Sequence, residues 1–389
     1  MAAHPPHSTP PAPSAPAVPR RTQAEALARA RRRRFLAETA LSLALPLVAW
    51  ASGLTVQLAE RFGATAAEPG WLRWVGTALL VGALLLAYRL CLLPLAYFAG
   101  YRLARRYGLA TQTARGWAVD WLKVTALTLA FGVLLALLFY AVVAVGGVHW
   151  WWMYGLVLSV GVVLLTYVTP YLLLPLFYRL RPLEPGPLTA RIEALFARAG
   201  VTAPPVAAID LSARTTAANA AVIGLGRSRR VVLGDTLLRE FSLDEIEAVV
   251  AHELGHHVRA DIWRGIAVEL GALWIGLGVA AGGLDPLFAA AGWGDWRAPA
   301  AFPLLVLLAE GLGLVALPLL NAFSRHVEQM ADRYALALTR NPAAFVAALC
   351  RLEAQNLLEP EPPRWAELLL YTHPPLARRL RAAEQARHA

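Results

Sequence analysis

The chain has 389 residues, of which 58% are hydrophobic and 16% charged, and its formal net charge is +10. This composition excludes an ordinary soluble protein and indicates a chain that crosses a membrane several times. No nucleic-acid partner is expected, because the arginines flank apolar runs, where positive charge fixes membrane topology. The two cysteines, Cys91 and Cys350, define no disulfide framework.

Residues 1–34 are predicted to form a disordered cytoplasmic tail. The first twenty are rich in proline, alanine and serine and cannot bury enough apolar surface to offset the entropy of ordering. Arginines then precede an apolar run that begins at Phe35. Because further apolar runs follow, we expect this run to be an uncleaved membrane anchor rather than an export signal.

Six apolar runs have about the length that crosses a bilayer. They cover residues 35–59, 72–99, 118–146, 150–177, 262–284 and 301–322. The positive-inside rule places both termini and the arginine-rich 100–118 loop in the cytoplasm. The predicted organisation is therefore N-terminal membrane helices (35–177), a cytoplasmic catalytic segment (178–261), two membrane helices (262–322) and a cytoplasmic helical segment (323–389).

The segment 178–261 has the character of a soluble α+β unit. Apolar residues at helical spacing predict an amphipathic helix from about residue 188 to 198. A β-like run follows at 206–209, and a second at 220–225 forms a hairpin with 231–233. Ser242 and Glu245 then form a capping box that starts a long helix running through His257.

That helix contains the sequence HELGH at residues 252–256. Histidines four residues apart lie on one helical face, so His252 and His256 can reach one tetrahedral zinc ion, while Glu253 is placed to act as a base. The competing interpretation is a surface helix with coincidental histidines. A catalytic zinc also needs a third protein ligand, which the short spacing of compact zincins does not supply here.

A candidate third ligand follows the last apolar run. Glu328 and Asp332 lie four residues apart, so Glu328 could bind zinc while Asp332 orients a histidine ligand. Spacing alone does not decide between Glu328 and two histidines, His326 and His257. A solvated acidic face is the alternative for both carboxylates.

Five motifs in a fixed order resemble the type I CAAX prenyl proteases, which are grouped with the HtpX-like membrane metallopeptidases. The motifs are residues 212–220, 224–238, 252–256, 325–332 and 371–375. The similarity extends from about Tyr101 to about Leu380. It implies a multi-pass α-helical membrane protein with a zincin-like catalytic segment and one zinc ion per chain.

The resemblance also implies roles for individual residues. It implies that Glu328 is the third zinc ligand, as in gluzincins, and that Arg325 and Asp332 support the ligands. It implies that the strand at Asn219 and Ala220 pairs with an extended substrate. His373 and Arg379 would stabilise the oxyanion of the tetrahedral intermediate. Without the resemblance, a helix-start residue is the favoured interpretation of His373.

The sequence departs from the family in two respects. The prenyl proteases usually have seven spans around a large chamber, whereas about six are counted here. Where many relatives have a histidine five residues after the second zinc histidine, this chain has Asp261. His257 points away from the ligand face. Glu269 and Glu310 lie inside apolar runs, where they either line an aqueous cavity or are paired or protonated.

The predicted function is a zinc metalloendopeptidase that cleaves membrane-associated peptides or proteins at the cytoplasmic face of a bacterial membrane. A non-catalytic zinc-binding scaffold is disfavoured by Glu253, which is not a ligand. An intramembrane site-2-type protease is disfavoured by the charges around the motif. The composition looks bacterial, so turnover of membrane proteins is preferred over cleavage of prenylated CAAX peptides. The oligomeric state stays open.

Overall fold

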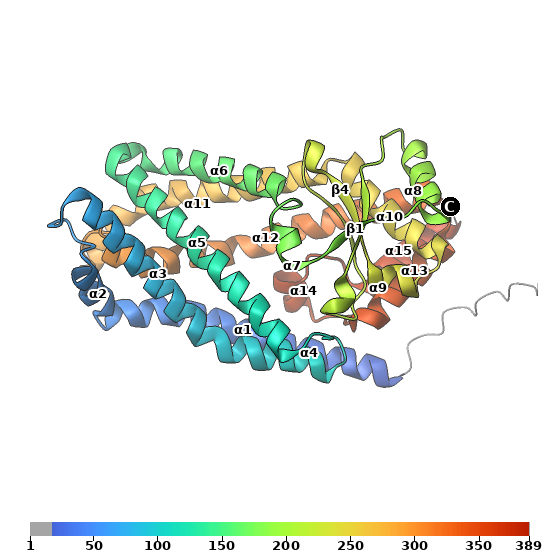
Figure 1. The fold of residues 1–389 in the computed structure, drawn as a ribbon, viewed down its shortest axis with the longest axis horizontal. Coiled ribbons are helices and arrows are strands. Elements are labelled where there is room, and N and C mark those ends of the chain that lie inside the picture. Colours follow the sequence, from blue (N-terminus) through green and yellow to red (C-terminus); the bar gives the residue numbers. More distant parts are fainter. Residues whose placement is uncertain (1–17, 389) are drawn as a thin grey trace, which may run out of the picture.

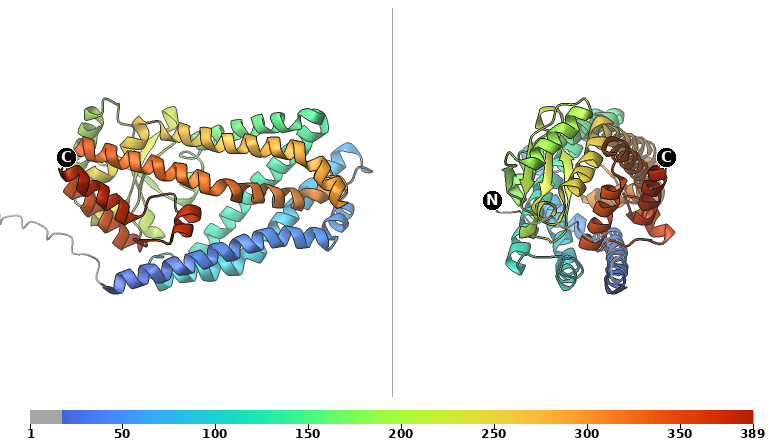
Figure 2. Two further views of the ribbon diagram at one scale, coloured as in Figure 1. Left: turned by 180° about the vertical axis from the view of Figure 1, so that it is seen from behind. Right: turned by 90° about the vertical axis from the view of Figure 1, so that its right-hand side faces the viewer.

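The computed structural model describes residues 18–388. Long helices occupy one end of the molecule, and a small sheet with its covering helices occupies the other (Figure 1). Figure 2 shows the same division from behind. The chain is mainly α-helical.

The N-terminal half consists of helices that run along the length of the molecule. They are α1 (Val18–Ala51), α2 (Leu54–Phe62), α3 (Gly70–Leu95), α4 (Leu103–Arg106), α5 (Ala114–Gly146), α6 (Trp150–Val168) and α7 (Leu173–Phe177). A π-helical stretch, Ala96–Arg102, joins α3 to α4. A 3-10 turn, Gly147–His149, joins α5 to α6, and the two helices diverge from this turn, with α6 running alongside α11 (Figure 1).

Five segments of residues 18–388 are long and apolar enough to cross a membrane. They are 21–51, 70–106, 114–168, 261–291 and 299–339. The third segment, of 55 residues, contains both α5 and α6, so each of the six predicted apolar runs overlaps one of the five segments. The first run is shorter than predicted, because Gly53, at φ 71°, ends α1 and starts α2 in a new direction.

The expectation of a disordered tail up to residue 34 is wrong from residue 18 onward, because α1 begins at Val18. Residues 1–17 of that expected tail lie outside the described part of the chain. Leu27 of α1 is buried in a cluster with Leu109 and Leu357, and Arg32 pairs with Glu359. Contacts with distant segments therefore order a sequence that is too polar to suggest a packed helix by itself.

The segment predicted to be catalytic is built on a four-stranded sheet with the order β1-β2-β4-β3. The strands are β1 (Leu180–Pro182), β2 (Val206–Ile209), β3 (Ala220–Ile223) and β4 (Arg230–Gly234). The predicted hairpin is confirmed, with Ala220 opposite Leu233 in the antiparallel pair of β3 and β4. The short β1 and the parallel pairing of β2 with β4 were not predicted. β3 lies at an edge of the sheet.

Helices cover the sheet and return the chain to the membrane bundle. They are α8 (Pro187–Arg198), α9 (Asp235–Glu240), α10 (Leu243–Val258), α11 (Asp261–Ala291), α12 (Phe302–Thr339), α13 (Pro342–Asn356), α14 (Arg364–Leu370) and α15 (Leu376–His388). The main core lies between the sheet, α8, α10 and α13, and includes Phe196, Leu233 and Leu254. α12 continues from the apolar end into this core (Figure 1), so one helix joins the two halves.

Candidate metal centre

The helix that carries the HExxH motif has a fixed start. The Ser242 hydroxyl accepts a hydrogen bond from the backbone N–H of Glu245 at 3.3 Å, and the Glu245 carboxylate accepts one from the N–H of Ser242 at 2.7 Å. This is the capping box predicted from the sequence. Because α10 begins at this cap and its apolar face is buried against the sheet, the direction of its histidine face is set.

α10 and α12 approach each other closely beside the motif. A Cβ atom built on Gly255 would lie 3.2 Å from the Cα atom of Ala331 and 3.3 Å from its carbonyl oxygen. Backbone atoms cannot move aside as a flexible side chain can, so glycine is needed for this spacing. Glu328 lies three residues before Ala331, and the close approach brings it to the histidines.

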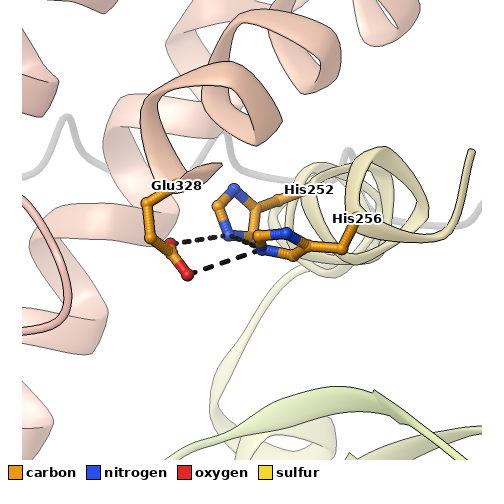
Figure 3. A group of neighbouring side chains, drawn as sticks. All are labelled: His252, His256 and Glu328. Atoms are coloured by element: carbon orange, nitrogen blue, oxygen red, sulfur yellow. Dashed lines mark hydrogen bonds and ion pairs between the residues drawn. The ribbon is translucent and has the colours of Figure 1, made fainter. Parts of the chain in front are cut away.

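Three side chains converge at this contact (Figure 3). The Nε2 atom of His252 lies 3.2 Å from Oε2 of Glu328, and Nε2 of His256 lies 3.5 Å from Oε1. The two Nε2 atoms are 3.3 Å apart. The three ligand atoms all lie within 4.8 Å of one another, which is a separation that one metal ion can bridge.

The other nitrogen of each histidine faces a carboxylate. Nδ1 of His252 lies 2.9 Å from Oδ1 of Asp332, and Nδ1 of His256 lies 3.1 Å from Oδ2 of Asp261. A carboxylate only accepts hydrogen bonds, so this arrangement holds the Nδ1 protons there and leaves the Nε2 lone pairs facing the centre. Carboxylate partners of this kind orient metal-binding histidines.

The donor set fits a divalent cation. Two Nε2 lone pairs and a carboxylate that point at one place repel each other unless a cation shares them. Oε2 of Glu328 is buried and has no hydrogen bond, although it lies 3.2 Å from His252. Two nitrogens and one carboxylate oxygen suit zinc among the common divalent metals, and these three groups leave a coordination position open.

The electrostatics favour positive charge at the same place. Burial alone would lower the pKa of His252, but Asp332 and Glu328 together raise it to about 9. Metal binding at such a centre therefore displaces protons. Burial raises the pKa of Glu253, which the neighbouring histidines and the N–H of Val222 oppose. A carboxylate with a raised pKa is a better proton acceptor than an exposed one.

Glu253 lies between the metal-binding face and the free edge of the sheet. Its Oε2 atom accepts a hydrogen bond from the backbone N–H of Val222 at 3.2 Å. Along the same edge, the N–H of Ala220 donates a hydrogen bond to Oδ1 of its neighbour Asn219 at 2.9 Å. These outward-facing groups of β3 are the ones to which an extended peptide would bind by strand addition.

Two cavities meet at Glu253. One, of about 110 Å³, is lined by Asn219, Ala220, His252 and also by His373 and Arg379. The other, of about 270 Å³, lies on the membrane side, between α11 and α12. The candidate metal centre therefore opens to space on both sides.

The C-terminal segment supplies two further side chains. Nε2 of His373 lies 3.3 Å from Oε1 of Glu328. Arg379 makes two hydrogen bonds to Asp332, at 2.8 and 2.6 Å, so part of its guanidinium holds the carboxylate behind His252. Arg325 does not touch the histidines. It donates to the carbonyl oxygens of Glu367 and Tyr371 and so fixes the segment that leads to His373.

The structure also places the residues that competed for the third position. His326 is exposed on another face of α12. His257 lies 3.3 Å from Arg229 and points away from the centre, as expected from its position on the helix. In the sequence, Asp261 stands out only as a departure from relatives. Ala260, at φ 54°, precedes α11 and turns the chain after α10, so that Asp261 lies beside His256, and the sequence gives little signal for that turn.

Asp332 and Asp261, which face the two histidines, should contribute about equally to the affinity for the metal. We expect Asp332→Asn and Asp261→Asn each to weaken binding of the metal about 10–100-fold, because the amide can present a donor where the imidazole N–H needs an acceptor. Competition with a fluorescent zinc chelator measures the affinity. Asp244→Asn, an exposed change on the same helix, is the control and should leave the affinity unchanged. An unchanged affinity in both aspartate variants would contradict the orienting role.

Comparisons with known proteins agree with this architecture. The family model described as peptidase family M48 matches residues 182–387, and the one described as CAAX prenyl protease N-terminal, five membrane helices, matches residues 6–179. An uncharacterized metalloprotease of Bacillus subtilis, YhfN, is 32% identical over 82% of this chain and 75% of its own length. The rice CAAX prenyl protease 1 homolog is 29% identical over 76% and 70%.

A solved structure supports the same assignment. The crystal structure of S. mikatae Ste24p matches with a TM-score of 0.79 and 25% identity, covering 94% of this chain and 88% of that one. The match spans both the membrane helices and the catalytic segment. The chain therefore belongs to peptidase family M48 and is a multi-pass membrane metalloendopeptidase with the membrane domain of the CAAX prenyl proteases.

Proposed function

We propose that this chain is a zinc endopeptidase in which His252, His256 and Glu328 hold the metal and Glu253 is the catalytic base. The observation that carries the proposal is the convergence of two Nε2 atoms and one carboxylate, 3.2 to 3.5 Å apart, next to the half-buried carboxylate of Glu253, which is hydrogen-bonded to Val222 instead. A zinc ion bound there polarises the scissile carbonyl and activates water.

The residues around the metal have separate tasks in this mechanism. Glu253 takes a proton from the attacking water and delivers it to the leaving amine. The edge of β3 at Asn219 and Ala220 holds the substrate backbone in an extended form. His373 and the part of Arg379 not bound to Asp332 stabilise the negative charge that develops on the carbonyl oxygen. Arg325 and Asp332 hold the other groups in place.

We assign the active site to the cytoplasmic face of a bacterial membrane. The arginine-rich loop after α3, the sheet and the start of α1 all lie at one end of the molecule (Figure 1), and the positive-inside rule puts that end in the cytoplasm. α10 is not part of any of the five candidate spans, which disfavours an intramembrane protease. The substrates we propose are membrane proteins that are processed or degraded, rather than prenylated peptides.

Metal removal tests whether the site is catalytic or only binds zinc. Purified protein in detergent should cleave an unfolded protein substrate, lose this activity on treatment with a chelator, and regain it with one equivalent of zinc. A scaffold would bind the zinc without any cleavage. Full activity after complete removal of metal would refute the proposed mechanism.

The substrate class needs a separate experiment in cells. Membrane proteins that accumulate with the Glu253→Gln form and not with the wild-type form are candidate substrates. If no membrane protein accumulates, the proposed role in turnover is wrong, whatever the purified enzyme does.

A further inference from the structure

A further acidic side chain lies in a cavity that borders the metal centre. Glu269 of α11 lines the 270 Å³ cavity together with Glu253 and His256. Val222 of β3 lines the same cavity, whereas Ala220 lines the 110 Å³ cavity on the other side. A peptide that pairs with β3 would thus place side chains in both cavities, with the scissile bond between them.

The walls of this cavity are mainly apolar. Ile262 and Val268 of α11 face Leu320, Phe323 and Val327 of α12 across it. The three α12 residues recur at helical spacing, so one face of α12 forms a wall. Such walls would suit a long aliphatic side chain, and Glu269 adds one negative charge to them.

Glu269 has no partner of its own. Within residues 18–388 it makes no ion pair or hydrogen bond. Glu310, which lies inside the last predicted span, accepts a hydrogen bond from Ser42, and Asp261 in the same cavity is engaged by His256 and Arg264. A carboxylate in a membrane helix is costly unless water or a cationic group meets it, so an unpaired one marks a functional position.

The distance along α11 indicates which substrate side chain could reach it. Glu269 follows Asp261 by eight residues, which is about 12 Å along the helix. Asp261 lies at the level of His256, so a short side chain next to the scissile bond would end well before Glu269. A lysine or arginine can extend its methylene groups along apolar walls and place its charge at the far end.

We propose that this cavity is a substrate subsite that binds a lysine or arginine side chain, with Glu269 as the residue that meets the charge. The inference rests on the proposed peptidase function, which it extends to a preference in the substrate. Glu269 acts on binding and takes no part in the chemistry.

The wild-type enzyme provides the first test. Peptides that differ only by arginine, norleucine or glutamate are compared at each of the three positions on either side of the scissile bond. At one position we expect kcat/KM to be about five- to tenfold higher for arginine than for norleucine, and lowest for glutamate. Cleavage of all peptides without any such preference would overturn the subsite while leaving the peptidase function intact.

Variants then assign the preference to Glu269. In Glu269→Gln the ratio of arginine to norleucine peptide should fall to about one, and in Glu269→Arg the glutamate peptide should become the preferred one. Glu310→Gln removes an acid of the neighbouring membrane helix α12 and should retain the wild-type ratio. A Glu269→Gln enzyme that keeps the arginine preference would overturn the assignment. If that variant does not fold, the shorter carboxylate of Glu269→Asp should give a reduced preference.

Discussion

Glu253→Gln should lose at least about 10³-fold in kcat with little change in KM. The amide has nearly the same shape as the carboxylate and can still accept the hydrogen bond from the N–H of Val222, so the fold and the cavity should be preserved. It cannot take a proton from water. Single-turnover cleavage of a fluorogenic peptide measures the rate, and elemental analysis measures bound zinc.

The informative result combines two measurements. Zinc content should equal that of the wild-type enzyme while cleavage is lost, because the Glu253 carboxylate is hydrogen-bonded to the N–H of Val222 and is not one of the three ligand groups. Glu247→Gln makes the same change on the same helix, at a carboxylate paired with arginines on α8, and should keep activity near the wild-type level. Cleavage by Glu253→Gln at the wild-type rate would show that the base has been assigned wrongly.

The parts of the site that the sequence predicts well are those encoded within a single element. The direction of His252 and His256 follows from the period of one helix, and the start of that helix follows from Ser242 and Glu245. The β3–β4 hairpin is equally local, because its two strands are joined by a short turn. The apolar runs are predictable because a bilayer sets their length.

Contacts between distant segments were harder to predict. The proximity of Glu328 to the histidines depends on the packing of α10 against α12, which Gly255 permits and which residue spacing alone does not reveal. The contact of Asp261 with His256 depends on the left-handed conformation of Ala260, a residue type that rarely adopts it. No local pattern predicts either feature.

The helical structure at the polar start of α1 also could not be predicted from the local sequence. Its composition predicts disorder, but burial of Leu27 against Leu357 and the pairing of Arg32 with Glu359 order it. Both partners come from the segment between α13 and α14, which lies more than 300 residues away in the sequence. Propensity describes the isolated chain, and tertiary contacts decide the outcome.

Glu328→Ala should lower the affinity for zinc on the order of 10²- to 10³-fold, as expected when one ligand of a site with a large binding free energy is removed. Glu328 is the ligand that comes from α12, whereas both histidines come from α10. Zinc bound by all three therefore ties the catalytic segment to a helix of the membrane bundle. We expect zinc to raise the thermal unfolding temperature of the wild-type protein and to have much less effect on Glu328→Ala.

His326→Ala separates this account from the alternative that spacing left open. His326 lies two residues before Glu328 but is exposed, so its removal should leave zinc affinity, activity and the stabilisation by zinc unchanged. Titration with a competing chelator and thermal unfolding with and without zinc measure both variants under the same conditions. If His326→Ala lost the metal and Glu328→Ala kept it, the third ligand would be the histidine, and α12 would have to be rotated about its axis relative to α10. The two variants thus test the packing of these helices as well as the identity of the ligand.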